Sequence, residues 1–355
     1  MAKKINVLVC GSKFGEYYLK ALSKLEKEFN IVGILSKGSE RSLKLSKDFK
    51  VPNYTNVQDL PQNIDLACVV VRSRGLGGEG TRLCMELMEK GISVIQEQPV
   101  HKEDWQDCYM MAQKQNVLYT TADLYMHLPS IKTFIDSMKF LNHKSKLEHI
   151  SISVSTQVAY TAFDILGVSE LSNKLILNEK VIKLKGPFDI VYGLLGNIPI
   201  IIEFNNRINI NNPDHNMYVM HNFRFYYDDG TLSLNDTFGP VSWRPRIYIN
   251  SDIYGKNIRE KPHFEEIYES KSSIKKIFNS TWIEAIMEEL LEIRNYIIGS
   301  ALPIGRLQRE IETVSNWEKL THVSGYSDFV QEDKETYLNF PEEMYVGKGN
   351  KNDKE

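Results

Sequence analysis

The stretch SVIQEQPVHKED, residues 93–104, places polar side chains directly after an apolar segment that predicts a strand. Glu97 and Gln98 follow this segment, and His101 comes shortly after them. A glutamine amide cannot transfer a proton at neutral pH, whereas a histidine changes its charge there. A second stretch, TADLYMHLP, contributes Tyr125. His101 and Tyr125 are therefore candidate proton donors.

The N-terminal stretch NVLVCGSKFGEYYLKAL favours a phosphate-binding turn between a strand and a helix. The dinucleotide-binding pattern is G-x-G-x-x-G or G-x-G-x-x-A. The match is degenerate, because Lys13 replaces the middle glycine and Glu16 the last small residue. A helix N-terminus still offers free N–H groups to a pyrophosphate. The alternative is that the glycines only shape a tight turn. We expect cofactor contacts from Gly11, Ser12, Lys13, Phe14 and Gly15.

The end of the second apolar run, GILSKGSERS, indicates which cofactor binds. An NAD site usually has an acidic residue there, on the ribose 2′-hydroxyl. Glu40 is the only acid in this stretch, and Lys37 and Arg41 offer positive charge to a 2′-phosphate. A solvated polar loop is the alternative interpretation. The stretch favours NADP(H) over NAD(H). Further expected cofactor contacts are Ser36, Lys37, Gly38, Ser39, Arg41, Arg72, Glu97 and Gln98.

The elements that position these residues alternate between strands and helices over residues 1–123. Five apolar runs, INVLVC, IVGIL, IDLACVVV, ISVIQEQP and VLYTTA, are separated by segments with helical spacing. In the first of these helices, Phe14, Tyr18, Leu22 and Leu25 share one face. The pattern predicts an α/β domain with a doubly wound parallel sheet of the Rossmann type.

Residues 124–347 have a different character and predict an α+β domain with a large, mainly antiparallel sheet. A helix over 130–141 precedes the strands LEHISISVSTQ, FDIVYGLLGN, PIIIEFNNRINI, YVMHNFRFYYDD, TLSLNDTF and RPRIYI. The turn DDGT is typical of a hairpin. Thr281 and Glu284 fit a capping box at the start of the helix TWIEAIMEELLEIRNYIIG. The polar tail 348–355 is expected to be disordered.

Composition excludes several classes of function. The 355 residues carry a net charge of -3, so nothing attracts the chain as a whole to nucleic acid or an anionic membrane. No apolar run approaches the roughly 18 residues that span a bilayer, and the short N-terminal apolar run reads as a strand rather than a signal peptide. The four cysteines are scattered without a metal-binding spacing. This pattern favours a reducing cytoplasm and no metal.

Four stretches spread over both domains resemble one family: VCGSKFGEYYLKAL, GILSKGSERS, STQVAYTAFDILG and GPVSWRPRIY. The chain resembles the Gfo/Idh/MocA oxidoreductases and, more narrowly, the thiazolinyl imide reductases of yersiniabactin- and pyochelin-type siderophore biosynthesis. The resemblance implies NADPH-dependent reduction of a thiazoline C=N to a thiazolidine. The implied partner is a carrier protein of a nonribosomal peptide synthetase, which holds the substrate as a thioester. The open face of the sheet in this fold implies a homodimer.

Two positions depart from the sugar-oxidising relatives. Those enzymes commonly carry Glu-Lys-Pro where this chain has Gln98 between Glu97 and a proline. They also carry Asp-x-x-x-His, whereas Asp164 is followed four residues later by Val168. Oxidation of a polyol needs a base and hydrogen-bonding groups, so these departures count against a sugar substrate.

Reduction of a ring imine needs a proton on nitrogen as well as a hydride on carbon, and a positioned acid contributes about 10²–10⁴-fold. The resemblance points to His101 and Tyr125 as the donors, directly or through a water. His127 reads as structural, His215 and His221 as possible pocket residues, and Asp164 as either a substrate-orienting or a capping group. The alternatives are another reductase or dehydrogenase of this family, acting on a sugar or small imine, and a non-catalytic NADP-binding sensor or scaffold.

Overall fold

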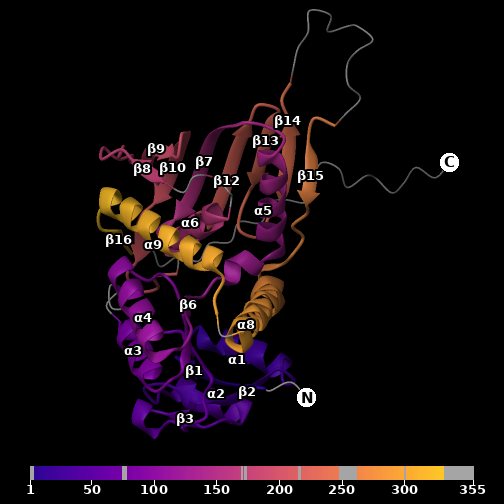
Figure 1. Cartoon of the computed structure of the whole chain (residues 1–355). Coiled ribbons are helices and arrows are strands. Elements are labelled where there is room, and N and C mark those ends of the chain that lie inside the picture. Colours follow the sequence, from indigo (N-terminus) through magenta and orange to yellow (C-terminus); the bar gives the residue numbers. More distant parts are fainter. Residues whose placement is uncertain are drawn as a thin grey trace, which may run out of the picture.

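The computed structural model describes residues 4–73, 78–168, 171, 174–214, 217–247, 262–299 and 301–331. Within them the chain forms two large sheets, one above the other in Figure 1. The predicted tail 348–355 and His215 lie outside the described residues. The predicted fold class, a Rossmann sheet followed by a mainly antiparallel sheet, is confirmed.

The first sheet is parallel, with strand order β3-β2-β1-β4-β5-β6. Because the order runs outward from β1 in both directions, right-handed crossovers place α1 and α2 on the face opposite α3 and α4. The strands are β1 (Ile5–Cys10), β2 (Phe29–Leu35), β3 (Asn53–Tyr54), β4 (Leu66–Val69), β5 (Ser93–Gln96) and β6 (Tyr119–Thr121). The helices are α1 (Gly15–Lys24), α2 (Glu40–Phe49), α3 (Gly80–Glu89) and α4 (Lys102–Gln115).

The local sequence explains where these elements lie. Strand β1 is apolar and buried almost throughout, as a central parallel strand must be when helices cover both faces. Helix α1 buries Tyr18 and Leu22 of its apolar face. Helix α2 begins at Ser39, whose side chain accepts a hydrogen bond from the Ser42 backbone N–H.

The second sheet has the order β15-β14-β13-β12-β7-β10-β9-β8, in which only β7 and β10 pair in parallel. Helices α5 (Pro129–Asn142) and α6 (Ala159–Gly167) lie on one face. The strands are β7 (Leu147–Ser155), β8 (Leu175–Leu177), β9 (Asp189–Leu195), β10 (Ile198–Asn205), β12 (His221–Tyr227), β13 (Gly230–Leu234), β14 (Val241–Pro245) and β15 (Glu265–Tyr268). A separate parallel pair joins β11 (Arg207–Asn209) to β16 (Asp328–Val330).

Three predicted details of this half differ from the structure. Helical backbone starts at Ile274 rather than Thr281, because Ser273 caps α7 (Ile274–Lys276) by accepting from the Lys276 N–H. The chain continues through a π-helical segment, η5 (Ile277–Thr281), into α8 (Trp282–Gly299). The strand expected at RPRIYI, residues 244–249, overlaps the end of β14 at Arg244 and Pro245, and Tyr248 and Ile249 lie outside the described residues. The sequence interpretation also left out α9 (Ile304–Ser324), a helix of 21 residues.

Helices from the C-terminal part of the chain complete the packing of the first sheet (Figure 1). Helix α8 packs against α1, and α9 packs against α4 and α6. The two halves therefore share a continuous buried region, although their sheets come from separate stretches of sequence.

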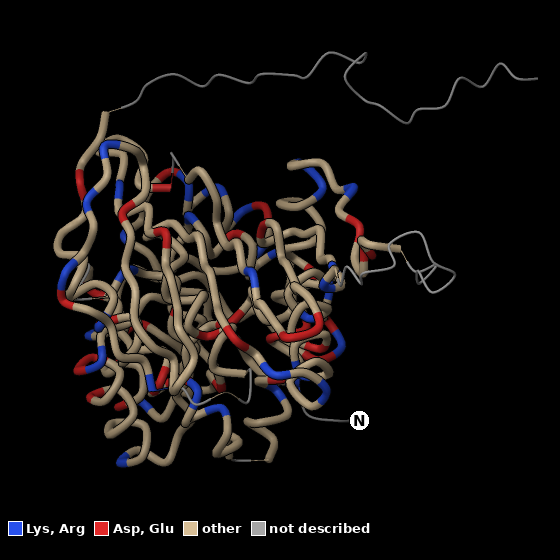
Figure 2. The backbone as a smooth tube through the Cα atoms, turned by 90° about the horizontal axis from the view of Figure 1, so that it is seen from above, with Lys and Arg blue, Asp and Glu red and all other residues tan. Residues whose placement is uncertain are grey.

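Figure 2 shows Lys and Arg interspersed with Asp and Glu over the molecule, in keeping with the small net charge. Among the residues that the structure describes, no helix is long and apolar enough to cross a membrane.

Candidate active site

Three segments follow the carboxyl ends of neighbouring parallel strands and form the candidate site. The loop after β1 carries Gly11, the segment after β5 carries Glu97 and Gln98, and the short helix η3 (Leu124–His127) after β6 carries Tyr125. Since β1, β4, β5 and β6 are consecutive in the sheet, these segments share one edge. Ligands of open α/β sheets bind at this edge.

The loop after β1 has the geometry of a phosphate-binding turn. Gly11 has φ +101°, and a Cβ at this position would lie 2.5 Å from the Val70 carbonyl oxygen, so only glycine fits. Helix α1 then begins at Phe14 without a side-chain cap, which leaves its first N–H groups for a ligand. These features fit the pyrophosphate of a dinucleotide.

Arg41 is exposed to solvent and contacts this loop. Its Nε donates to the Ser12 carbonyl at 2.9 Å, and its Nη2 pairs with Glu16 at 2.7 Å. The guanidinium thus ties the start of α2 to the phosphate loop. Lys37 and Ser39 are exposed nearby, between β2 and α2, and Gly38 has φ +75°. Positive charge therefore stands at the end of β2, where an NAD site carries an acid.

Of the two polar side-chain atoms of Gln98, one is hydrogen-bonded within the protein and the other is not. Its Nε2 donates to the Ala122 carbonyl at 2.7 Å, which fixes the amide. Its Oε1 is buried and has no hydrogen-bond partner in the protein. An acceptor that is oriented but unpartnered at this edge fits a ligand with an amide donor, and the nicotinamide carboxamide is such a group.

Tyr125 is a partly buried phenol surrounded by acids. Its ring meets His221 edge-on, with ring centroids 5.3 Å apart. Burial, and then the negative charges of Glu97, Asp214 and Asp236, raise the pKa of the Tyr125 hydroxyl well above its ordinary value. Tyr125 can donate a hydrogen bond here, but a lasting phenolate is disfavoured.

His221, a possible pocket residue from the sequence, contacts the Tyr125 ring and is held by hydrogen bonds at both ring nitrogens. Its Nε2 lies 3.0 Å from the Val158 carbonyl and must carry the proton, since a carbonyl only accepts. Its Nδ1 then accepts from the Thr237 hydroxyl at 2.9 Å. Burial lowers the pKa of His221 to about 4, which keeps the ring neutral.

His101 lies at the N-terminal end of α4 and faces α9. Its ring centroid is 4.8 Å from that of Trp317, and its Nδ1 is 3.7 Å from Glu318. The side chain is 35% exposed, so a proton can reach it from solvent. Arg72 is exposed beyond the end of β4.

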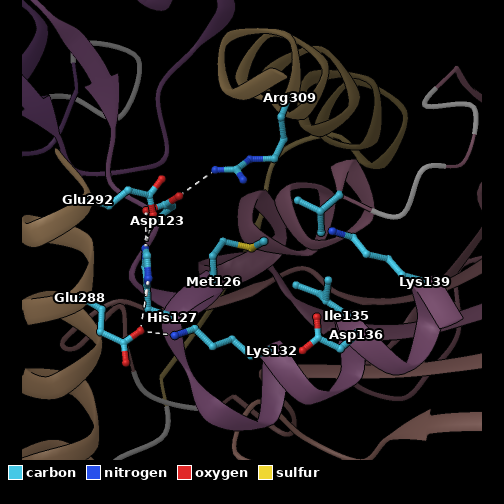
Figure 3. Close-up of a pocket in the computed structure, with 11 residues that line it drawn as sticks. Asp123, Met126, His127, Lys132, Ile135, Asp136, Lys139, Glu288, Glu292 and Arg309 are labelled. Carbon is cyan, nitrogen blue, oxygen red and sulfur yellow. Dashed lines mark hydrogen bonds and ion pairs between the residues drawn. The ribbon is translucent and has the colours of Figure 1, made fainter. Parts of the chain in front are cut away.

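Asp164 and Val168, the positions compared with the sugar enzymes, lie near a different hollow. Asp164 is buried and pairs with Arg309 at 2.9 Å, so it anchors α6 to α9. Val168 and Arg309 line a cavity of about 400 Å³ between α5, α8 and α9 (Figure 3). No residue of the phosphate loop lines it.

Figure 3 shows how the charges in this cavity pair. Asp123 lies between Arg309 and His127, and Glu288 bridges His127 and Lys132. The expectation that His127 is structural agrees with these contacts. Within the residues that the structure describes, no cluster of His, Cys, Asp or Glu could hold a metal ion.

Three residues at the strand edge were missed by the sequence interpretation. Asp214 pairs with Lys13 at 3.2 Å. The Tyr18 hydroxyl lies 3.3 Å from Glu97 and 3.4 Å from Glu289. A signal for Glu289 was present, because it shares the apolar face of α8 with Ile286, Leu290 and Ile293. The partners of Lys13 and Tyr18 could not be inferred, because they lie between 79 and 271 positions away in sequence.

Comparison with known proteins agrees with this geometry. Residues 5–122 match the oxidoreductase family with an NAD-binding Rossmann fold, Gfo/Idh/MocA. Residues 145–244 match the C-terminal domain of Irp3-like thiazolinyl imine reductases. No curated protein sequence matches the chain.

Solved structures share the fold at low identity. A 3-ketoreductase from Actinomadura kijaniata in complex with NADP and TDP-benzene is 12% identical, with a TM-score of 0.67 over 92% of this chain and 100% of that one. A UDP-N-acetylglucosamine 3-dehydrogenase from Acidithiobacillus ferrooxidans is 10% identical, with a TM-score of 0.65 over 90% and 98%. With its Rossmann strand edge and both matched domains, the chain belongs to the Gfo/Idh/MocA oxidoreductases and has a C-terminal domain of the Irp3-like thiazolinyl imine reductase type.

Proposed function

We propose that this protein is an NADPH-dependent reductase of a thiazoline C=N bond, acting on a siderophore intermediate held by a carrier protein of a nonribosomal peptide synthetase. The observation that carries the proposal is the match of residues 145–244, in the half that forms the large sheet, to thiazolinyl imine reductases. The strand edge supports it, because Gln98 stands where a sugar dehydrogenase has a lysine. An imine needs no base to remove a hydroxyl proton.

The residues at the strand edge have separate roles in this reaction. Bound nicotinamide supplies the hydride for the ring carbon. Gln98 Oε1 orients the carboxamide of the nicotinamide, and Tyr125 donates a hydrogen bond toward the nitrogen of the thiazoline ring. The nitrogen gains one proton as the C=N electron pair moves onto it. His101, which solvent can reach, is the second candidate for delivering that proton.

The cofactor is NADPH rather than NADH, because Arg41 and Lys37 stand where an NAD site needs an acid. We expect NADPH to bind at least about tenfold tighter than NADH, on the order of 1.4 kcal/mol. Arg41→Ala removes the guanidinium beside Ser12 and narrows that ratio. Fluorescence titration of both cofactors measures it. Equal affinities in the unmodified protein would show that the positive charge does not bind a 2′-phosphate.

We also propose that the protein acts in the cytoplasm as a homodimer, through the face of the second sheet opposite α5 and α6. Ile176, Leu194 and Ile201 lie on neighbouring strands of that face and are 37–50% exposed. Exposed apolar side chains in adjacent strands are typical of a surface that another chain covers. Light scattering tests the dimer, and a monomer at micromolar concentration contradicts it.

Turnover of a carrier-bound aryl-thiazoline tests the activity. We expect oxidation of NADPH, followed by its absorbance, together with a gain of two hydrogens in the carrier-bound group by mass spectrometry. Nucleotide sugars, assayed in the oxidative direction with both oxidised cofactors, serve as the comparison because one structurally similar enzyme is a UDP-N-acetylglucosamine 3-dehydrogenase. Turnover of a sugar without turnover of the thiazoline refutes the proposal. Cofactor binding with no turnover of either favours a sensor.

A further inference from the structure

A buried carboxyl group, Glu289, and a partly buried one, Glu97, share a single hydroxyl at the candidate site. The Tyr18 hydroxyl of α1 lies 3.3 Å from Glu97 Oε2 and 3.4 Å from Glu289 Oε2. Tyr18 and Glu289 are 1% and 0% exposed. The other Glu289 oxygen accepts from the Asp123 N–H at 2.7 Å. The three groups form a continuous hydrogen-bonded chain from α8 through α1 to the end of β5.

This arrangement requires that one of the two carboxyl groups is protonated. A phenol has one O–H, so it can donate to only one of the two carboxylates at a time. If both were ionised, one would face the phenol oxygen with no donor, at a high cost in a buried site. The stable arrangement has Glu289 protonated and donating to Tyr18, while Tyr18 donates to Glu97.

Burial and the neighbouring charges also favour a protonated carboxyl group here. Burial raises the pKa of Glu97 to about 7. Burial, together with the charge of Asp123, raises the pKa of Glu289 well above its ordinary value, although Arg306 opposes this. Cys68 on β4 and Tyr125 in η3 are the other titratable groups that interact with this set. A lysine at position 98 would have added a positive charge beside Glu97.

We propose that Glu289, Tyr18 and Glu97 form a proton relay that stores one proton and delivers it to the strand edge, where the proposed reaction must protonate nitrogen. Glu289 Oε2 passes its proton to the Tyr18 oxygen as Tyr18 passes its own to Glu97 Oε2. Glu289 becomes a carboxylate and Glu97 becomes neutral. Glu97 then gives its proton to the site, and solvent returns one proton through Glu97 after product leaves. No electrons move along the relay.

The relay rests on the proposed function only for its purpose, so its first test needs no substrate. Infrared spectroscopy of the cofactor-bound protein detects the carbonyl stretch of a protonated carboxylic acid. We expect this band to persist at pH 8 and to disappear in Glu289→Gln. The matched control is Glu284→Gln, which removes an exposed acid from the same helix. Absence of the band in the unmodified protein at pH 8, or its survival in Glu289→Gln, overturns the proposal.

The second test measures turnover of the thiazoline under conditions in which the chemical step limits the rate. We expect Glu97→Gln to lower turnover by about 10²-fold. Tyr18→Phe and Glu289→Gln, which lie away from the expected cofactor contacts, should lower turnover by about tenfold each and leave NADPH affinity nearly unchanged. Because the latter two act in one path, their double variant should be no slower than either alone. Turnover of the unmodified protein should fall only at high pH, where Glu289 loses its stored proton, and this fall should vanish in Glu289→Gln.

Tyr227→Phe is the control for loss of a buried tyrosine hydroxyl, since Tyr227 donates to Asn142 in the second sheet. If the three groups had only a structural role, their substitution would lower stability and leave the pH dependence of turnover unchanged. If the losses of turnover multiplied in the double variant, Tyr18 and Glu289 would not act in a single path. If Glu289→Gln does not fold, the pH profile of Tyr18→Phe decides. A normal infrared result without thiazoline turnover in the unmodified protein refutes the proposed function and leaves the relay standing.

Discussion

Glu97 and Gln98 are neighbours in sequence but have different tasks at the strand edge. The Gln98 amide is held by the Ala122 carbonyl and presents its free oxygen. The Glu97 carboxyl contacts the Tyr18 hydroxyl below it. Loss of the lysine found in sugar-oxidising relatives removes a cation from beside Glu97. A carboxyl that is buried without a cation keeps its proton to higher pH.

This protonation has a measurable effect on stability. The pKa of Glu97 rises from 4.5 to about 7 on folding, so the folded state binds the proton more tightly than the unfolded state. The favourable contribution is complete below about pH 4.5 and is lost as pH rises through 7. Glu97→Gln imitates the neutral form. We expect it to match the unmodified protein near pH 4 and to exceed it at pH 8, by at most about 3 kcal/mol.

Urea denaturation of both proteins across this pH range measures the difference. A constant difference in unfolding free energy between pH 4 and pH 8 would mean that Glu97 titrates equally in both states, which contradicts its burial.

At the scale of elements, the alternating strands and helices could be predicted because each has a clear period and a turn signal. Helix α9 was not predicted from the sequence because its buried face is not uniformly apolar. Arg306, Glu310 and Thr313 are buried on it, beside Val314 and Trp317. A helix that meets charged partners in the interior gives a weak hydrophobic pattern. Those partners, Asp123 among them, lie nearly 200 residues earlier and are not visible in the local sequence.

Arg306 holds this element to the first sheet. It donates to Thr120 Oγ1 at 2.9 Å and to the Thr121 carbonyl at 3.0 Å, and it pairs with Asp123 at 3.0 Å. Although burial alone would raise it, the charges of Arg306 and Arg309 hold the pKa of Asp123 well below its ordinary value. Asp123 is therefore a buried anion that depends on these cations.

Arg306→Met should lower the free energy of unfolding by about 3–5 kcal/mol, because it leaves Asp123 and Glu310 without their shared partner. Chemical denaturation at pH 7 measures the loss. The control on the same helix is Gln308→Ala, an exposed position where we expect a change within about 0.5 kcal/mol. A loss at Arg306 no larger than at Gln308 would mean that water or rearranged side chains replace its bonds.

At the scale of the whole molecule, both halves of the chain contribute to the cofactor edge. Lys13 in the phosphate loop and Asp214, which follows β11, pair at 3.2 Å although they are 201 positions apart. The cofactor interpretation of the sequence could place Lys13, because glycine spacing and a strand–helix turn are local. Asp214 could not be placed, because only the folded chain brings the two loops together.

The pair predicts a competition between Asp214 and the cofactor. A pyrophosphate bound at the N-terminus of α1 attracts Lys13 and repels Asp214. The ion pair between the two residues must therefore break before Lys13 can contact the pyrophosphate. Asp214→Asn should therefore raise NADPH affinity. Both side chains are mostly exposed, and exposed pairs contribute little, so the gain should be at most about fivefold at low salt.

Salt dependence separates this competition from a structural effect of the substitution. Raising ionic strength from about 0.01 M to 1 M shortens the screening length from about 30 Å to 3 Å, and the gain in affinity should disappear. The control is Glu26→Gln, which removes an exposed acid beyond the far end of α1 and should change affinity little. Weaker NADPH binding by Asp214→Asn would instead mean that Asp214 contacts the bound cofactor, and that the second half of the chain holds the dinucleotide directly.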